Sequence, residues 1–277
     1  MGRSRSFLSG RAAAALVAAV FATAALATPD VASDPPALDG RGIMEQVDLR
    51  PRGADQRLRM VWHLREPSGR ERVRETRSYW RDYRERDPQL RSKRLIVFDA
   101  PQDIRETALL VWSYRETGID DDRWIYLPAL RKVRRVAGKD RGRSFTGSEF
   151  NYDDLGDREV DEDTHVLLRT ETANGRELQV VESTPRDADS PYSRRVHWVD
   201  AKRFTVPRIE YYDAHARLAK VLTIDWKDVG GVWDWSRLRM ENVRSGRSTE
   251  VEVTEVVHGL GLPDDAFSES ALRFGVP

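Results

Sequence analysis

Cysteine is absent from the 277-residue sequence, and this absence sets the first limits on what the protein can be. Without cysteine the chain has no disulfide framework, no thiolate metal site and no thiol to which a lipid could be attached. We therefore predict that the protein is not itself a lipoprotein. Histidine is also scarce, with five residues, and none lies two to four positions from another histidine or forms an HExxH-like pair. We accordingly predict no metal site and no cofactor.

Sequence motifs of common enzymes are missing as well. Around Ser144, the second glycine stands one position too far along for a GxSxG nucleophile elbow, and residues 259–261 lack the third glycine of a dinucleotide fingerprint. Runs of adjacent acids such as 120–122 lack the alternation of a calcium loop and are typical of solvated turns. We predict no catalytic residue and no enzymatic activity. A secreted enzyme that acts on a lipid or glycan is the weakest alternative.

Long apolar runs are nearly absent, and the one at the N-terminus is typical of a secretory signal. Three arginines within the first 11 residues are followed by an apolar region over residues 12–24 and a small-residue cleavage motif over 25–27. The run is shorter and richer in alanine than most membrane anchors, which are the alternative. We expect cleavage after about Ala27, a flexible leader over residues 28–37 and a mature protein in the periplasm.

An excess of charge of one sign is absent too. The chain has 46 basic and 46 acidic residues, and removal of the predicted signal, which holds three arginines and no acid, leaves a small negative balance. Nothing in this balance predicts binding to nucleic acid. The length fits one large domain with a substantial core, and we predict that residues 38–277 form it and that the protein is a monomer.

Alternating apolar and polar residues, the pattern of a strand with one buried face, are abundant. Residues 58–64 are apolar at every second position, and the segments 164–172 and 176–184 are joined by Asn-Gly, a strong signal for a hairpin. Such segments recur along the chain at hairpin spacing, which predicts a mainly β fold with about eleven antiparallel strands. A sheet of that size must close on itself or cover its concave face, because free edges and apolar surface would otherwise be exposed.

Short helices are expected beside this sheet. Residues 38–47 carry apolar side chains at helical spacing behind a potential N-cap, Asp39. Ser148 followed by an acid could begin a second short helix over residues 148–154, packed at the concave side. A final turn or short helix near the C-terminus could be capped by Asp264.

The stretch DRWIYLPALRKVRRVAG (122–138), followed by FTGSEFNYDDL (145–155), joins two short strands at a proline corner to a basic cluster and a glycine-punctuated acidic segment. It resembles the signature of the bacterial outer-membrane lipoprotein-sorting protein family, the larger LolA/LolB-like relatives of the periplasmic carrier LolA. Outside this stretch the resemblance rests on strand pattern and length, over about residues 40–270. It implies an unclosed antiparallel β-barrel wrapped around short α-helices, whose concave face binds acyl chains without catalysis.

Candidate binding residues follow from the resemblance and from the aromatic content. A wide barrel leaves a cavity lined by aromatic and aliphatic side chains, although ordinary core packing is the alternative for each of them. Guanidinium groups suit phosphates and carboxylates, so the arginines could gate the cavity by pairing with Glu149, Asp153 or Asp154; a solvated surface is the alternative. The candidate lining and gate residues are Trp62, Leu64, Phe98, Leu110, Trp112, Trp124, Tyr126, Arg131, Arg134, Arg135, Phe150 and Tyr152.

The expected function is that of a periplasmic carrier. It would hold the acyl chains of a lipoprotein, or a free lipid, in an apolar cavity and deliver them towards the outer membrane. The resemblance implies an inner-membrane RND-type exporter and an outer-membrane receptor as partners. A structural adaptor of such an exporter, without a ligand of its own, is the alternative from another class. Cavity volume separates the two, because an adaptor would be packed solid.

Overall fold

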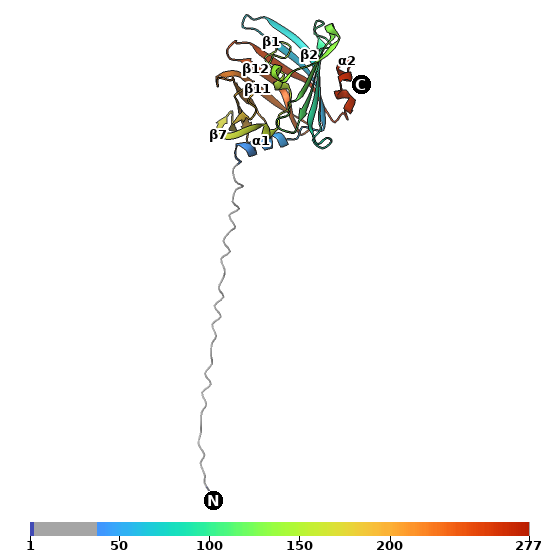
Figure 1. Ribbon diagram of the computed structural model, residues 1–277. Helices are drawn as coiled ribbons and strands as arrows, with labels where there is room; N and C mark the ends of the chain where they lie inside the picture. The colour runs from blue at the N-terminus through green and yellow to red at the C-terminus, as the bar shows by residue number, and fades with distance from the viewer. Residues whose placement is uncertain (3–37, 277) are drawn as a thin grey trace. The chain divides into compact units, whose positions relative to one another are not determined.

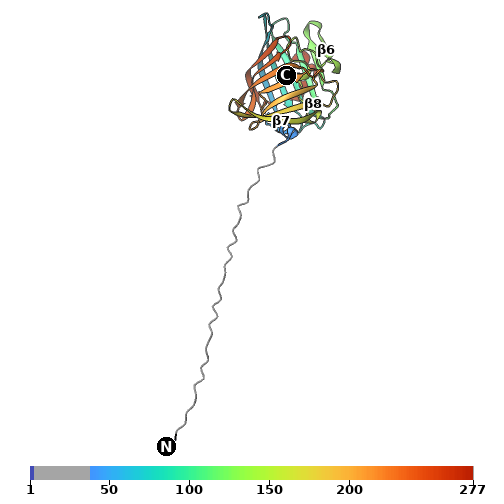
Figure 2. The same ribbon diagram turned by 90° about the vertical axis from the view of Figure 1, so that its left-hand side faces the viewer.

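Thirteen antiparallel strands between residues 55 and 258 form one continuous sheet that curls around a concave face (Figure 1, Figure 2). The computed structural model describes residues 1–2 and 38–276. The predicted signal and leader, from residue 3 to residue 37, therefore lie outside the described residues.

The sheet is a meander in which each strand pairs with the next strand of the sequence, except that β6 does not pair with β7, and one long-range junction joins the two halves. The strands are β1 (Asp55–Arg65), β2 (Glu71–Asp82), β3 (Leu90–Ala100), β4 (Ala108–Tyr114), β5 (Asp122–Leu127), β6 (Lys132–Arg135), β7 (Asp163–Ala173), β8 (Arg176–Pro185), β9 (Arg194–Asp200), β10 (Arg208–Tyr212), β11 (Leu218–Val229), β12 (Val232–Asn242) and β13 (Ser248–His258).

The junction joins the first strand to the last and leaves the sheet unclosed. β1 pairs with β13, so that β6 and β7 become the two edges of the sheet although they are neighbours in sequence. Among the described residues no ladder joins these two edges. The predicted unclosed antiparallel barrel is therefore confirmed. The predicted count of about eleven strands is two too low, and the shortest strands, β6 and β10, have four and five residues.

The β7–β8 hairpin forms as its Asn-Gly dipeptide predicts. Asn174 and Gly175 have φ angles of 52° and 71°, and the strands pair up to Ala173 and Arg176 on either side of them. Two successive residues with positive φ give the turn a twist that matches the strands, and asparagine and glycine reach this region at low cost. The hairpin thus sets the register of the β7 edge.

The predicted N-terminal helix is present as α1 (Gly40–Leu49). Its N-cap is Asp39, whose Oδ1 accepts a hydrogen bond of 2.7 Å from the backbone N–H of Gly42. Ile43 is fully buried and packs with Val181 and Val199 on the sheet beside the β7 edge. None of the helices within residues 38–276 has the length and apolar character that a membrane crossing requires.

The predicted helix over residues 148–154 is wrong. Only a 3₁₀ turn, η3 (Asp153–Leu155), forms there, and the hydroxyl of Ser148 donates to the carbonyls of Phe145 and Phe150 instead of capping a helix. The other 3₁₀ turns are η1 (Pro128–Leu130), η2 (Gly138–Asp140), η4 (Val160–Glu162) and η5 (Asp264–Phe267).

The C-terminal segment is ordered as predicted, but its cap is a different residue. The last helix, α2 (Glu269–Phe274), is capped by Ser268, which accepts a hydrogen bond of 3.2 Å from the backbone N–H of Ala271. Asp264 instead accepts hydrogen bonds of 2.8 Å from Arg81 and from the hydroxyl of Tyr83, and so attaches the segment to β2 and its end.

Each face of the sheet carries its own apolar cluster. The concave cluster contains Trp62, Phe98 and Leu109, whereas the convex cluster contains Leu110 and Phe267. Figure 1 shows α2 on the outer side of the sheet, where it covers the convex cluster. Successive residues of β4 therefore point to opposite faces, and both faces are buried.

Candidate functional site

An aromatic loop fills part of the concave face. We call residues 144–155 the roof segment; an isolated bridge between Ser144 and Asn151 closes its loop, and Phe145 donates its backbone N–H to the carbonyl of Phe150 at 2.8 Å. Phe145 and Phe150 are buried, and their ring centroids lie 6.2 and 5.7 Å from that of Trp62. The loop thus enters the barrel as an aromatic plug.

Polar groups hold the roof segment to the strands below it. Asn151 donates its side-chain amide to the hydroxyl of Tyr192 at 2.9 Å, and that hydroxyl lies 3.1 Å from both oxygens of Asp154. Lys220 donates to the carbonyl of Glu149 at 2.7 Å. Burial raises the pKa of Asp154, while the nearby Lys220 opposes this shift. The segment is therefore attached by a small polar network as well as by its aromatic rings.

An apolar cavity of about 290 Å³ remains between the roof segment and the strands. Five of the eight tryptophans line this apolar cavity, together with aliphatic side chains such as Met60 and Ile224, whereas Arg50 and Asp234 are among its polar residues. Such a wall of mainly apolar groups with a few polar ones is typical of a site for an apolar ligand. The five tryptophans are Trp62, Trp80, Trp226, Trp233 and Trp235.

The structure brings some of the predicted lining residues to this cavity. Trp62 and Phe150 line it directly. Leu64 and Phe98 are buried in the same concave cluster, and Tyr152 packs against that cluster from the roof segment. These five predicted residues therefore lie on the concave side.

Four other predicted residues lie on the convex face. Leu110 is buried in the convex cluster, and Trp112, Trp124 and Tyr126 pack against it. The indole of Trp112 donates a hydrogen bond of 3.0 Å to the carbonyl of Phe267 in the C-terminal segment. The sequence of β4 is apolar on both faces, so it contains no signal for which residues point inwards, and a shift by one residue exchanges the faces.

The three predicted gate arginines lie outside both the apolar cavity and the charged cavity described below. Arg131, Arg134 and Arg135 are exposed on the β5–β6 connection and on β6. Arg135 forms an ion pair with Asp122. Asp153, a predicted partner of these arginines, instead lies near Arg123, Arg141 and Arg195, at 3.6, 3.8 and 3.2 Å.

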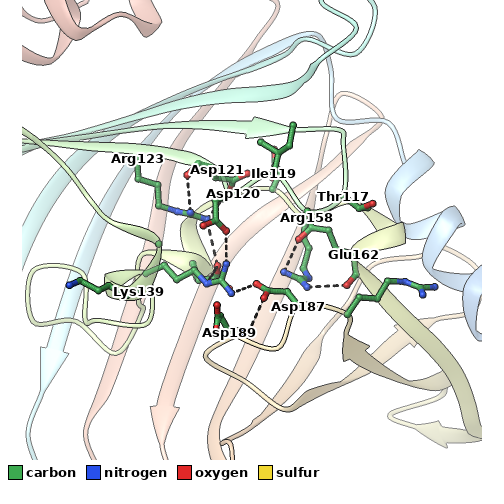
Figure 3. A pocket seen from close by; sticks show the side chains of 17 residues that line it. Thr117, Ile119, Asp120, Asp121, Arg123, Lys139, Arg158, Glu162, Asp187 and Asp189 are labelled. Atoms are coloured by element: carbon green, nitrogen blue, oxygen red, sulfur yellow. Dashed lines mark hydrogen bonds and ion pairs between the residues drawn. The ribbon is translucent and has the colours of Figure 1, made fainter.

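A second, charged cavity of about 800 Å³ lies where the connections from the two edges of the sheet meet (Figure 3). It is bounded by residues 117–121 before β5, 138–141 after β6 and 186–189 after β8. Figure 3 shows Asp120, Asp121 and Asp187 converging towards its centre, while Lys139 points away. The charged lining residues are Asp120, Asp121, Asp153, Asp157, Glu162, Asp187, Asp189, Arg123, Lys139, Arg141, Arg158 and Arg186.

Arg141 is the central cation of the charged cavity. It donates to Asp120 at 2.8 Å and forms an ion pair with Asp187, so it connects the chain before β5 to the chain after β8. Burial raises the pKa of Asp121 to about 7, although the neighbouring Arg123 opposes this shift. Sequence reasoning missed this site, because it assigned the runs of adjacent acids to solvated turns; the recurrence of such runs beside isolated arginines was the available signal.

The two cavities share a wall. Gly156 and Asp157 line both of them. Asp157 accepts hydrogen bonds of 2.6 Å from the indole of Trp80 and 2.7 Å from Ser92, and Arg94 lies 3.4 Å away. Burial opposes its ionisation, yet Arg94 and neighbouring arginines hold the pKa of Asp157 below its usual value. Asp157 is therefore an ionised group between an apolar and a charged space.

Comparison with known proteins agrees with this architecture. A family model with the description "-like: Uncharacterized protein" matches residues 91–274. A DUF1329 family protein from Desulfovibrio piger is 32% identical, with 84% of this chain and 97% of that chain covered and a TM-score of 0.80. No curated protein matches the chain.

Two further solved structures are similar. A domain from Vibrio parahaemolyticus, described as an outer membrane lipoprotein-sorting protein domain, is 30% identical, with 84% of this chain and 98% of that chain covered and a TM-score of 0.79. A LolA superfamily protein from Nitrosomonas europaea, 18% identical over 84% of this chain and 99% of its own with a TM-score of 0.67, shares the fold. The chain therefore belongs to the outer membrane lipoprotein-sorting protein family, with the LolA-like fold.

Proposed function

We propose that the protein is a periplasmic carrier that binds the acyl chains of lipoproteins or free lipids in the apolar cavity and delivers them towards the outer membrane. The observation that carries this proposal is the apolar cavity itself, lined by five tryptophans and closed by the roof segment. Each buried methylene contributes about 0.8 kcal/mol, so an acyl chain can bind tightly without any polar chemistry. Such a role requires no catalytic residue.

The volume of the cavity supports a carrier that opens. About 290 Å³ is just below the range of roughly 300–1,000 Å³ that is typical of small-molecule sites, and two or three acyl chains need more room. Displacement of Phe145 and Phe150 would supply it, because both rings occupy the concave face beside the cavity. The polar network of Asn151 and Asp154 would then have to exchange its partners for water. The roof segment would thus act as a movable cover.

Delivery requires a stronger competitor for the acyl chains than the cavity. We propose an outer-membrane receptor or the membrane itself as that competitor, and an inner-membrane RND-type exporter as the source of the ligand. These partners follow from the family and not from a described contact. An adaptor without a ligand is the alternative, and the apolar cavity argues against it because an adaptor gains nothing from unfilled apolar space.

Tryptophan fluorescence tests the carrier directly. Brominated fatty acids quench tryptophans that they contact, and five tryptophans line the apolar cavity whereas Trp112, Trp124 and Trp198 do not. We expect saturable quenching of the cavity tryptophans. Val232, at the start of β12, lines the cavity, and Val232→Phe should raise the Kd about tenfold, the effect of displacing about two methylenes.

The matched control is Val243→Phe, just beyond the other end of β12, where the side chain is exposed and lines no cavity. It should leave the Kd unchanged. Absence of saturable quenching in the wild type, or equal effects of the two variants, would favour the adaptor.

A further inference from the structure

The shared wall between the two cavities is a single segment of the chain, residues 153–158, which begins with the 3₁₀ turn η3. Asp154 and Leu155 line the apolar cavity, Asp153 and Arg158 line the charged cavity, and Gly156 lines both. Gly156 has extended backbone angles, but a Cβ atom there would overlap the carboxylate of Asp121. A glycine therefore lets the Asp121 carboxylate lie against the wall at Gly156, which with Asp157 lines both cavities.

The charges that line the charged cavity favour a ligand group that carries both signs of charge. Seven acids and five basic residues line it, so a group that carries only negative charge meets a net negative surface. A group with both signs can enter an arginine–carboxylate pair without leaving either partner alone, because its anion contacts the guanidinium and its cation the carboxylate. The charge pattern thus selects a zwitterionic group.

Two side chains of the charged cavity have a polar group to which no other described residue is hydrogen-bonded. The Nε of Arg141 is buried and has no hydrogen-bond partner among the described residues; the Asp153 carboxylate lies 3.8 Å from it, beyond hydrogen-bonding distance, and the residue as a whole is 8% exposed and lines the charged cavity. The carboxylate of Asp189 lines the same cavity, and within residues 38–276 it takes part in no ion pair. One donor suited to a phosphate and one acceptor suited to an ammonium are therefore available.

We propose that the charged cavity binds a phosphoethanolamine-type headgroup of a lipid whose acyl chains occupy the apolar cavity, the ligand crossing the shared wall when the roof segment, which includes Asp154 and Leu155, is displaced. This inference rests on the proposed carrier function and names its ligand class. Arg141 is assigned to the phosphate and Asp189 to the ammonium.

Three brominated ligands with the same acyl chain length separate the contributions of chain and headgroup: a fatty alcohol, a phosphatidylethanolamine and a phosphatidylglycerol. Quenching of the cavity tryptophans gives a Kd for each. In the wild type, phosphatidylethanolamine should bind about tenfold more tightly than phosphatidylglycerol, which lacks the ammonium and carries a net negative charge. The fatty alcohol reports on the apolar cavity alone.

Charge reversal at Asp189 tests the headgroup site. Asp189→Lys should reduce the preference for phosphatidylethanolamine to within about twofold and leave the Kd of the fatty alcohol unchanged. Asp225→Lys makes the same charge change at an exposed position of β11 outside both cavities, and should keep the tenfold preference. Both side chains are exposed, so both variants should fold.

The outcomes distinguish this inference from the carrier function. If the alcohol binds and the two phospholipids bind equally to the wild type, the headgroup site is refuted and the carrier stands. The same conclusion follows if Asp225→Lys abolishes the preference as strongly as Asp189→Lys, since net charge would then explain it. If no ligand quenches the tryptophans, the carrier function fails and the headgroup site fails with it.

Discussion

The apolar cavity and the charged cavity lie on two sides of the same stretch of chain, yet they are built by different parts of the sequence. Strand residues supply most of the apolar wall, from β1, β2, β3, β10, β11, β12 and β13. Connections and turns supply most of the charged wall, from the chain before β5, after β6 and after β8. Regular alternation thus makes the apolar space, and the meeting of irregular segments makes the charged one.

The difference shows how the two edges of an unclosed barrel are connected without a backbone ladder. β6 and β7 share no ladder, so backbone hydrogen bonds do not join the two edges. Ion pairs connect the two halves of the sheet instead: Arg141 bridges Asp120 and Asp187, and Asp153 lies near Arg123 of β5 and Arg195 of β9. Side-chain pairs can separate and re-form more readily than a ladder, which is compatible with the proposed opening of the carrier.

The largest effect is expected at Asp157, the charged residue of the shared wall. Asp157→Ala leaves Arg94 and Arg52 without their carboxylate and removes the acceptor of the Trp80 indole. Loss of one partner from a buried ion pair costs about 3–5 kcal/mol, so the free energy of unfolding should fall by about that amount in urea titrations.

Two variants accompany this measurement. Asp157→Asn keeps an acceptor for the indole of Trp80, so its free energy of unfolding should fall less than that of Asp157→Ala. The control Asp225→Ala, at an exposed site, should keep a free energy of unfolding within about 0.5 kcal/mol of the wild type. A loss below about 1 kcal/mol for Asp157→Ala would show that water replaces the carboxylate and that the wall does not keep the two spaces apart.

The apolar half of this comparison was largely predictable and the charged half was not. Period-two segments predicted the strands and the barrel, and Asn174-Gly175 predicted one hairpin in detail, because both signals are local. The direction in which a strand faces was predictable only where one face is polar, as around Trp62. In β4 both faces are apolar, and the burial of Leu110 under the C-terminal segment depends on residues far away in sequence.

The roof segment and the charged cavity depend on tertiary contacts throughout. Ser148 and the acids after it match a helix start locally, but burial of Phe145 and Phe150 against Trp62 determines the conformation of that loop. The partners of Arg141 lie in two other connections, and no local pattern indicates them. The runs of acidic residues therefore indicated where charge is concentrated, but not how the residues of the charged cavity are arranged.

An intermediate, pH-dependent effect is expected at Asp121 on the charged side of the wall. Its folded-state pKa is raised by burial to about 7, from an ordinary value near 3.8. Between these values the unfolded chain releases the proton while the folded protein keeps it, so this group destabilises the folded state progressively as the pH rises from about 4 to about 7. The asparagine in Asp121→Asn cannot ionise, so this variant does not lose stability in this way as the pH rises.

Urea titrations at pH 4.5 and pH 8 test this sign. The stability of Asp121→Asn relative to the wild type should be more favourable at pH 8 than at pH 4.5, by more than about 1 kcal/mol. The attraction of Arg123 acts on the ionised carboxylate and already opposes the raised pKa of Asp121, so losing it in the variant does not change the expected sign of the difference. A relative stability that is the same at both pH values would show that Asp121 is ionised throughout and that the charged cavity is more solvated than its geometry indicates.

The smallest effect on stability is expected from Arg134 and Arg135, which are basic residues outside both cavities. Arg135 forms one exposed ion pair with Asp122, and Arg134 forms none within the described part of the chain, so the double change to alanine should cost less than about 1 kcal/mol. Because neither residue lines a cavity, the Kd for brominated phosphatidylethanolamine should also stay within twofold. Transfer of that lipid to anionic vesicles should nevertheless slow, and slow less at high salt, if these arginines meet the acceptor surface as gate residues would. Unchanged transfer would leave them as solvated surface, and a large loss of stability would make them structural; either result would end their assignment to a gate and leave Arg141 and Asp153 as the charged groups that hold the open side of the barrel.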